Sequence, residues 1–286
     1  MAGSGTLIAG ASAAGLAALL MRPESEWSLS EAALLAAREV SYPDLAVDDY
    51  QAVLLEAGLR LALRVPVKAS LRYRLAALNE HMFRTLGYAG DTSEYYDPRN
   101  SFLNEVIDRR LGIPITLSII YLELGRHAGL ALAGVSYPGH FLVKLELEGG
   151  IAVLDPFQGG ASLDESELQR RLSVSHASAI PPPLPQVLQA ASRREILTRL
   201  LRNLKLIYLQ RESWEQALAV CNGLVAASKA EPGELRDRGL VLEQLDCPGA
   251  AAHDLESYLA LDPQAEDAED IRRRLLAVRA LATPPN

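Results

Sequence analysis

The chain has 286 residues, more than a single domain usually contains, so we expect two units that each bury a core. It carries 28 basic and 36 acidic residues, which gives a net charge of −8 at neutral pH. No dense cluster of Lys and Arg is present that could neutralise a run of phosphates, so direct binding of nucleic acid is not expected.

The amino-terminal part of the chain is predicted to be a series of helices. The segment from Gly5 to Met21 is uncharged but diluted by Gly, Ser and Ala, and no basic residue precedes it. We therefore expect a helix of a soluble, cytoplasmic protein here rather than a signal peptide or a membrane anchor. Ser28-Leu29-Ser30-Glu31 has the pattern of a capping box, which predicts a helix that ends near Tyr42-Pro43. Two further helices are expected over residues 47–63 and 68–86.

Residues 87–100 contain glycines, a proline and turn-forming polar residues, which predict a loop leading to Ser101 as the cap of the next helix. The apolar residues of that helix recur at helical spacing, as Phe102, Leu103, Val106, Ile107 and Leu111. Gly112 is expected to end it. Pro114, whose missing N–H costs nothing in a first turn, is expected to begin another helix that runs to about Ala128.

The pattern then changes to the alternation typical of strands, with one strand that begins near His140 and a second that ends at Asp155. The register of this hairpin has two solutions. A two-residue turn at Gly149-Gly150 puts Asp155 opposite Lys144, where the two could form an ion pair. A longer loop centred near Leu147-Glu148 puts Asp155 opposite His140 instead.

The run Ile180-Pro181-Pro182-Pro183-Leu184-Pro185 is expected to be an extended linker, because proline disfavours both helices and central strands. A proline-rich ligand for another domain is the alternative. Beyond it the helical sequence repeats with a period of about 34 residues. The positions that recur are Asn203, Leu206, Ala217 and Leu224, as Asp237, Leu240, Ala251 and Tyr258.

That period is typical of tetratricopeptide helix pairs, in which a small residue such as Ala217 or Ala251 lets paired helices approach closely. Two ordinary antiparallel helical hairpins are the alternative interpretation. Two units are few for a freestanding solenoid, so we expect the tail to pack on the preceding domain.

Long, ordered motifs lie between Tyr95 and Gly160. They are Tyr96-Asp97-Pro98-Arg99-Asn100-Ser101, Leu103-Asn104-Glu105-Val106, Arg109-Arg110, Gly112-Ile113-Pro114-Ile115, Pro138-Gly139-His140-Phe141 and Asp155-Pro156-Phe157. This series resembles the bacterial SirB-like family, a transglutaminase-like core followed by tetratricopeptide repeats, whose name is associated with transcriptional regulation. The resemblance implies an α+β core, mostly helical with a small antiparallel sheet, and an all-α tail. It divides the chain into a transglutaminase-like domain (1–178), a proline-rich linker (179–192) and a repeat domain (193–286).

Papain-like and transglutaminase-like enzymes, which this block resembles, place a cysteine at a helix start, where backbone N–H groups stabilise the thiolate. A His activates the cysteine and an Asp orients the His. The order of elements here is the same, but the helix start falls at Pro114 and no cysteine lies near it. His140 and Asp155 remain as a candidate pair, and the resemblance favours contact between them. Thr116 and Ser118 carry hydroxyls near the same turn, but each needs a general base to become a nucleophile.

The other residues that the motifs single out are Asn100, Glu105, Arg109 and Arg110. Glu105 and Arg109 have the spacing of an ordinary intrahelical ion pair. The resemblance allows the alternative that these side chains line a cleft beside the site.

The two cysteines, Cys221 and Cys247, both lie in the tail, and their spacing fits neither a zinc site nor a disulfide framework. We expect both to be small buried residues of a reduced protein. The histidines outside the motifs have no partner spacing that suggests a metal site, so no metal and no cofactor are predicted; they are His81, His127, His176 and His253.

Two main hypotheses about function follow. The missing thiol favours a non-catalytic protein, a pseudoenzyme that binds a protein or peptide partner through its cleft or its repeats and acts as an adaptor or regulator. The alternative is an amidohydrolase or acyltransferase that uses Thr116, Ser118 or a water activated by His140 with Asp155. A third possibility is that the helical tail alone binds the partner and the core is a platform.

Overall fold

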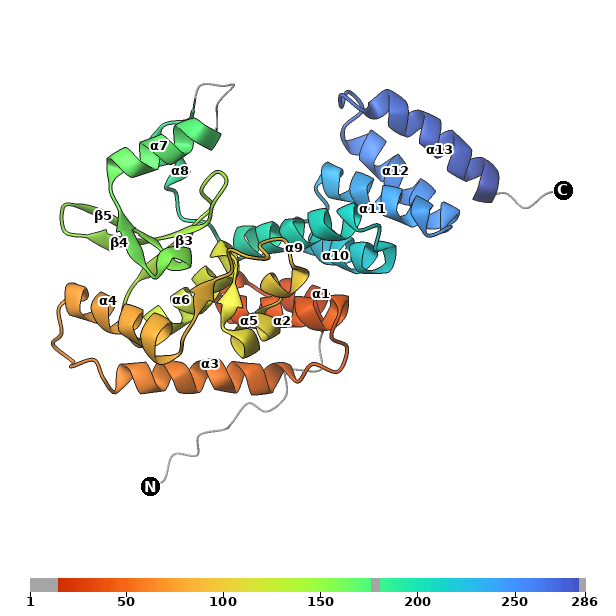
Figure 1. The fold of residues 1–286 in the computed structure, drawn as a ribbon. Helices are drawn as coiled ribbons and strands as arrows, with labels where there is room; N and C mark the ends of the chain where they lie inside the picture. Colours follow the sequence, from red (N-terminus) through yellow and green to blue (C-terminus); the bar gives the residue numbers. More distant parts are fainter. Residues whose placement is uncertain (1–14, 176–180, 283–286) are drawn as a thin grey trace.

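The computed structural model describes residues 15–175 and 181–282, which are mainly helical with a small antiparallel sheet (Figure 1). The helices are α1 (Leu16–Leu20), α2 (Leu29–Val40), α3 (Val47–Ala62), α4 (Leu71–Asn79), α5 (Leu103–Arg109), α6 (Pro114–His127), α7 (Glu165–Ser175), α8 (Leu184–Val187), α9 (Arg193–Gln210), α10 (Trp214–Ala227), α11 (Pro232–Gln244), α12 (Pro248–Leu261) and α13 (Ala268–Ala282). Short 3₁₀ turns are η1 (Glu24–Glu26), η3 (Pro98–Asn100) and η4 (Pro156–Gln158), and η2 (Glu80–Thr85) is a π-helical turn. The strands are β1 (Ala89–Gly90), β2 (Leu111–Gly112), β3 (Leu132–Val135), β4 (Leu142–Leu147), β5 (Gly150–Asp155) and β6 (Ala161–Leu163).

The main sheet has four strands in the order β3-β4-β5-β6, and each neighbouring pair is antiparallel. Its two faces bury different side chains because residues alternate along each strand. Val143, Leu145 and Leu154 belong to the large core that includes α6, whereas Leu142 and Val153 pack with α7 and α8. The predicted α+β class is confirmed.

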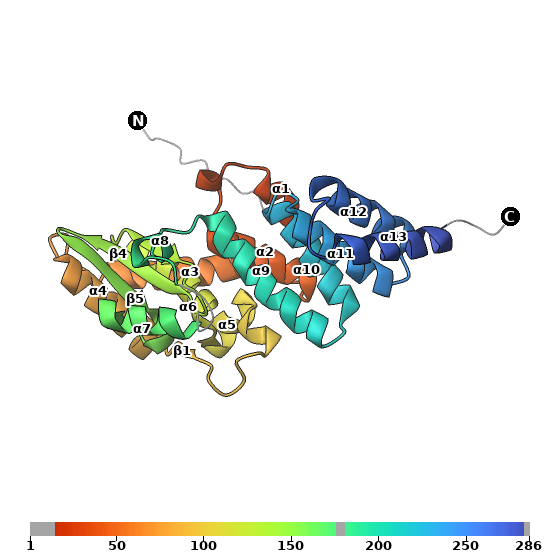
Figure 2. The ribbon, with the colours of Figure 1, turned by 90° about the horizontal axis from the view of Figure 1, so that it is seen from above.

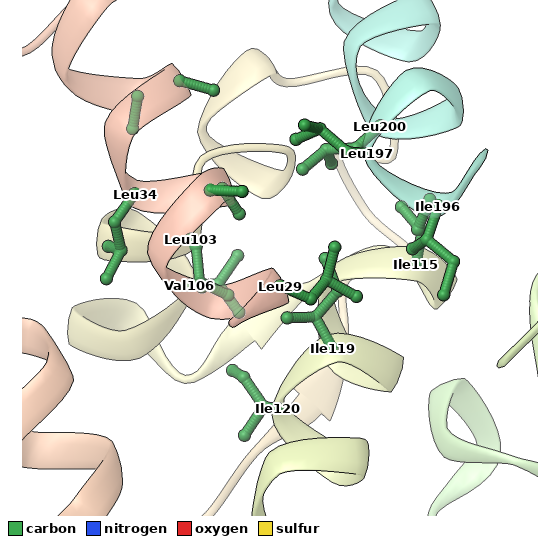
Figure 3. Packing of buried hydrophobic residues seen from close by; sticks show 14 of the residues in the cluster. Leu29, Leu34, Leu103, Val106, Ile115, Ile119, Ile120, Ile196, Leu197 and Leu200 are labelled. Atoms are coloured by element: carbon green, nitrogen blue, oxygen red, sulfur yellow. The ribbon is translucent and has the colours of Figure 1, made fainter. Parts of the chain in front are cut away.

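The large core joins helices that are far apart in sequence. Figure 3 shows Leu34 of α2, Leu103 of α5, Ile115 and Ile119 of α6 and Leu197 of α9 in one apolar cluster. Each of these side chains is at most 2% exposed, so the cluster excludes water and fixes α6 against α2 and α9.

Several helix starts use the caps that the sequence indicates. The Ser28 hydroxyl accepts a hydrogen bond from the Glu31 N–H at 3.0 Å, as the capping-box pattern predicts. Ser192 caps α9 in the same way, and Glu195 completes that box by accepting from the Ser192 N–H. These bonds satisfy backbone donors that a helix start otherwise leaves free.

The tail consists of the helix pairs α9–α10 and α11–α12, followed by α13 (Figures 1 and 2). Ala217 and Ala251, the small residues of the predicted repeat, are both fully buried. Close approach of α11 and α12 is also visible at Gly239, where a Cβ atom would lie 2.8 Å from Leu255. The helices therefore pair where the period predicts.

The tail packs on the core, as expected for so few repeats. α9 and α10 both pack against α2, and α1 packs against α10 (Figure 2). Arg194 of α9 donates to the carbonyl oxygens of Leu20 at 2.7 Å and Ala227 at 3.2 Å, and the hydroxyls of Ser41 and Tyr208 lie 3.1 Å apart. The first repeat and the amino-terminal helices thus form one packed layer.

Some local predictions were wrong. Phe102 rather than Ser101 is the N-cap of α5, and the C-cap of this helix is Arg110, whose φ of 61° is left-handed, rather than Gly112. Gly112 lies in β2, which pairs with β1 inside the expected loop. Leu184 begins α8 inside the proline run, because a proline at the second position of a helix loses no hydrogen bond.

Residues 5–14 of the predicted amino-terminal helix and residues 176–180 before the proline run lie outside the described residues. Among the helices that the structure describes, none is long and apolar enough to cross a bilayer.

Candidate functional site

His140 and Asp155 are in contact. His140 Nε2 lies 2.9 Å from Asp155 Oδ1, and the carboxylate is fully buried whereas the imidazole is 18% exposed. His140 closes a turn in which its N–H donates to the Tyr137 carbonyl oxygen, and Gly139 supplies the positive φ of 69°. Asp155 is the last residue of β5, and its Oδ1 also accepts from the Phe157 N–H at 3.1 Å.

Neither predicted register produces this contact. In the hairpin, Val143 lies opposite Leu154 and Leu147 lies opposite Gly150, so the turn residues are Glu148 and Gly149. The register is therefore intermediate between the two solutions. His140 precedes β4 and reaches the Asp155 carboxylate diagonally across the hairpin.

Arg171 of α7 completes the site from a third element. Its Nη1 lies 3.0 Å from Asp155 Oδ2, and its Nε lies 2.6 Å from Glu167. Burial alone would raise the pKa of Asp155, but the hydrogen bond from His140 and the charge of Arg171 outweigh it and hold the pKa below its usual range. The carboxylate therefore stays ionised and is shared between the imidazole and the guanidinium.

The residues at the start of α6 are buried and do not face solvent. Pro114 is buried, and the Thr116 hydroxyl donates to the Asn100 carbonyl oxygen at 2.8 Å and accepts from the Ile113 N–H at 3.1 Å. The Ser118 hydroxyl donates to the Pro114 carbonyl oxygen at 2.7 Å. Both hydroxyls are fully buried, so both serve the local backbone.

Arg109 holds the loop before α5. It donates to the Asn100 side chain at 3.1 Å and lies 3.5 Å from Asp91, rather than pairing with Glu105 as expected. Glu105 instead accepts a hydrogen bond from the Tyr42 hydroxyl. The pKa of Tyr42 is raised, mainly by burial and further by the charge of Glu105 and this hydrogen bond.

Arg110 pairs with Tyr88. Its guanidinium donates to the Tyr88 hydroxyl and lies 4.8 Å from the centroid of the same ring. The loops around α5 are thus held by contacts of three of the predicted site residues, Asn100, Arg109 and Arg110.

Comparison with known proteins agrees with this architecture. A family model described as the transglutaminase-like superfamily matches residues 48–202. The chain belongs to that superfamily. A tetratricopeptide-repeat model matches residues 204–276, which identifies the paired helices of the tail as such repeats.

Relatives of this transglutaminase-like protein include a UPF0162 protein of Xylella fastidiosa (strain 9a5c), 40% identical over 250 residues that cover 87% of this chain and 89% of the relative. A UPF0162 protein of Vibrio cholerae is 32% identical and covers 79% and 82%. Protein SirB1 of Salmonella typhimurium is 30% identical and covers 61% and 64%. The chain is thus SirB-like, as its motifs indicate. No solved structure matches it.

Aromatic rings border the His140–Asp155 pair of the transglutaminase-like core. The Phe157 ring meets the His140 ring edge-on at 6.1 Å between centroids, and Tyr95 meets Phe157 at the same distance. A Cβ atom at Gly90 would lie 2.6 Å from the Phe157 ring, so a glycine at this position lets β1 pack closely against that ring. Sequence reasoning gave no role to Tyr95, although it directly precedes the first motif, and it did not single out Arg171, which lies outside the motifs.

Both thiols lie in the repeats. Cys221 is fully buried in α10, and burial raises the pKa of its thiol to about 12. Cys247 is exposed at the N-cap of α12, so the prediction that it is buried was wrong. Among the described residues, no group of three or more His, Cys, Asp and Glu side chains is placed to hold a metal.

Two cavities flank the start of α9. One of about 830 Å³ lies between the segment before α2, α6 and β3. The other, of about 860 Å³, lies between α8, α9 and the loop before α11. The described residues that line them do not include His140 or Asp155, so the imidazole faces neither cavity.

Proposed function

We propose that this protein is a non-catalytic transglutaminase-like protein of the cytoplasm that acts as an adaptor or regulator by binding a protein or peptide partner. One observation carries the proposal, namely the start of α6. At the helix start, where the resemblance implies the activated thiol within a residue or two, the chain has the buried Pro114, and the neighbouring hydroxyls of Thr116 and Ser118 are bonded to backbone carbonyl oxygens. A hydroxyl in that state has neither a free path to a substrate nor a base to deprotonate it.

The Asp155 carboxylate also supports a structural role for the pair. In an activated His–Asp pair the carboxylate stabilises the imidazolium that forms during proton transfer. Here the carboxylate is shared between His140 and Arg171, which lies 3.0 Å from Asp155 and is itself paired with Glu167. The carboxylate therefore also anchors α7 to the hairpin, a structural use that requires no proton transfer by His140.

The cavity beside α8 and α9 is the binding groove we favour for the partner. It lies where the core meets the repeats, a class of module that generally binds proteins. Arg199 on its wall donates to the carbonyl oxygens of Tyr137 and His140, and Lys229 is exposed at the rim. Two carboxylates also line the groove, but Glu231 is paired with Arg202 and Glu195 accepts from the Ser192 N–H. We infer that the partner presents an acidic, extended peptide segment to this groove.

The enzymatic side of the proposal is tested with the purified full chain on two kinds of acyl substrate. Incorporation of a fluorescent amine into glutamine peptides and hydrolysis of peptide amides are measured for the wild type and for His140→Ala. We expect both proteins to give the rate of the buffer alone. Turnover by the wild type that His140→Ala abolishes would refute a non-catalytic role.

The binding side is tested by cross-linking the full chain to its partners in the native cell extract and identifying the cross-linked peptides. We expect acidic peptides joined to residues around the groove beside α8 and α9. Lys229→Glu should reduce this capture, whereas Arg84→Glu, which reverses an 80% exposed charge on the η2 turn, should leave it unchanged. Equal capture by Lys229→Glu and the wild type would exclude this groove.

The contact between His140 and Asp155 favours one second candidate, a hydrolase that activates a water molecule. This candidate needs no nucleophile from α6. It predicts hydrolysis without a covalent intermediate and equal loss of activity in His140→Ala and Asp155→Ala. Labelling of Thr116 or Ser118 by a hydroxyl-directed acylating probe would refute both candidates, since both require these hydroxyls to stay bonded.

A further inference from the structure

α3 carries two apolar stripes, of which only one faces the core. Its buried stripe includes Leu54 and Leu61. On the opposite side of the helix, Leu55, Leu59 and Leu63 are 49%, 52% and 89% exposed, although their spacing of four residues places them on one face. A single exposed leucine needs no explanation, but a stripe of three on one face indicates a contact surface.

The stripe lies on the outside of the molecule. Figure 1 shows α3 along one edge of the core, on the side away from the sheet and from the repeat helices. Its inner face packs against α6 and α2. The outer stripe is therefore far from the proposed partner groove and is open along the length of the helix.

The charges at the two ends of the stripe have opposite signs. Asp48 and Asp49 are exposed in the first turn of α3, and Arg64 and Lys68 are exposed just beyond its last turn. A parallel pair of such helices would place like charges side by side. An antiparallel pair places the acidic end of each helix beside the basic end of the other.

We propose that this face binds a second copy of the same chain, as a symmetric dimer in which the two α3 helices pack antiparallel. A two-fold axis between Leu55 and Leu59 places Leu55 of each copy against Leu59 of the other. The same axis brings Asp49 of each copy near Arg64 of the other. The stripe and its charges are thus self-complementary, as a two-fold contact between identical surfaces requires.

The interface is small, because each copy contributes one helix. Interfaces at the low end of specific complexes bury less than about 1,200 Å² and are often transient. The dimer is therefore expected to be in equilibrium with the monomer at micromolar concentrations, and its population should increase with concentration.

The first test measures the mass of the full chain by light scattering after size exclusion, over a dilution series. We expect a mass that rises with concentration from 31.0 kDa towards twice that value. Leu59→Glu should weaken dimerisation by about tenfold or more, because it would bury an unpaired carboxylate. The matched control is Leu206→Glu on α9, where the leucine is 58% exposed. A monomer at every concentration, or equal effects of the two variants, would overturn the proposal.

The second test establishes the orientation by disulfide cross-linking in a Cys247→Ser background. A mixture of Leu55→Cys and Leu59→Cys chains should cross-link to each other faster than either does to itself. Faster self-linking of each variant would indicate a parallel pair and overturn the arrangement. Thermal unfolding of every variant shows that the chain remains folded.

The third test reverses the charges. Changing Asp48 and Asp49 to Lys should weaken the dimer, and adding Arg64→Asp and Lys68→Asp to the same chain should restore it. No recovery in the fourfold variant, with its fold intact, would overturn the role of these charges.

Discussion

Arg199 of α9 donates a hydrogen bond of 2.7 Å to the carbonyl oxygen of His140, and the same nitrogen donates to the Tyr137 carbonyl oxygen at 2.9 Å. The guanidinium also lies 5.6 Å from the centroid of the Phe141 ring. The turn that carries the imidazole is therefore held by a side chain of α9, the helix in which the match to the transglutaminase-like model ends and the match to the repeat model begins.

Replacing Arg199 by Met should loosen this turn. Two charge-assisted hydrogen bonds are lost while the apolar stem is kept, so we expect a loss of about 1–3 kcal/mol in the free energy of unfolding. The NMR signals of the His140 ring should shift in parallel. Thr198→Val, a neighbouring change on the same helix, serves as the control and should leave those signals in place. An unchanged His140 spectrum in Arg199→Met would contradict the inferred support.

Removing the Asp155 charge should produce a stability change that depends on pH. The pKa of Asp155 is held below its usual range, so its contribution is fully present above about pH 4, the usual Asp value, and is lost as the pH falls through the lower folded value. Asp155→Asn leaves Arg171 without this partner and should cost about 3 kcal/mol at pH 7. Urea unfolding at pH 7 and below pH 4 checks this, because the gap between the two proteins should narrow in acid. A constant gap would show that charge is not the cause.

The two thiols should react at very different rates. The raised pKa and full burial of Cys221 keep its thiol protonated and inaccessible, whereas Cys247 is exposed. A colorimetric thiol reagent should therefore modify one thiol per folded chain and both in denaturant. Cys247→Ser should show no fast reaction when folded. Fast labelling of Cys221 in the folded protein would contradict its burial and would make it a candidate reactive thiol.

Lys205 should be essential to the first two repeats. Its ammonium lies 2.6 Å from Glu234 and 2.5 Å from Asp237, and all three side chains are largely buried between α9 and α11. Lys205→Met leaves Glu234 with Arg202 and Asp237 with Arg236 as their remaining cations and should lower the free energy of unfolding by about 1.5–3 kcal/mol. Lys229→Met removes an exposed cation and should have little effect. Calorimetry of the two variants provides the comparison, and equal melting temperatures would be inconsistent with the buried cluster.

The sequence predicts the elements around the site better than their geometry. Pro114 marks the start of α6 because proline suits a first helical turn and little else in that context. The hairpin register could not be predicted, because the adjacent Gly149 and Gly150 both permit a turn. The structure uses Gly149, with a φ of 89°, at the second turn position.

Long-range partners could not be predicted at all. Arg171 and Arg199 are ordinary positions on amphipathic helices, and nothing local distinguishes them from the exposed arginines nearby. Their roles depend on how α7 and α9 lie on the sheet, which is set by packing of the whole core. The expected pair of Glu105 and Arg109 was wrong for the same reason, since Asp91 reaches Arg109 from a loop that only tertiary structure brings close.

The border between the two family matches falls inside α9, a helix of 18 residues and thus about 27 Å long. Its middle carries both contacts: Arg199 bonds the His140 turn, and Lys205, six residues further along, joins the charge cluster with α11. Because both contacts lie on one continuous helix, a partner that tilts the repeats would also move the guanidinium that holds the backbone of His140.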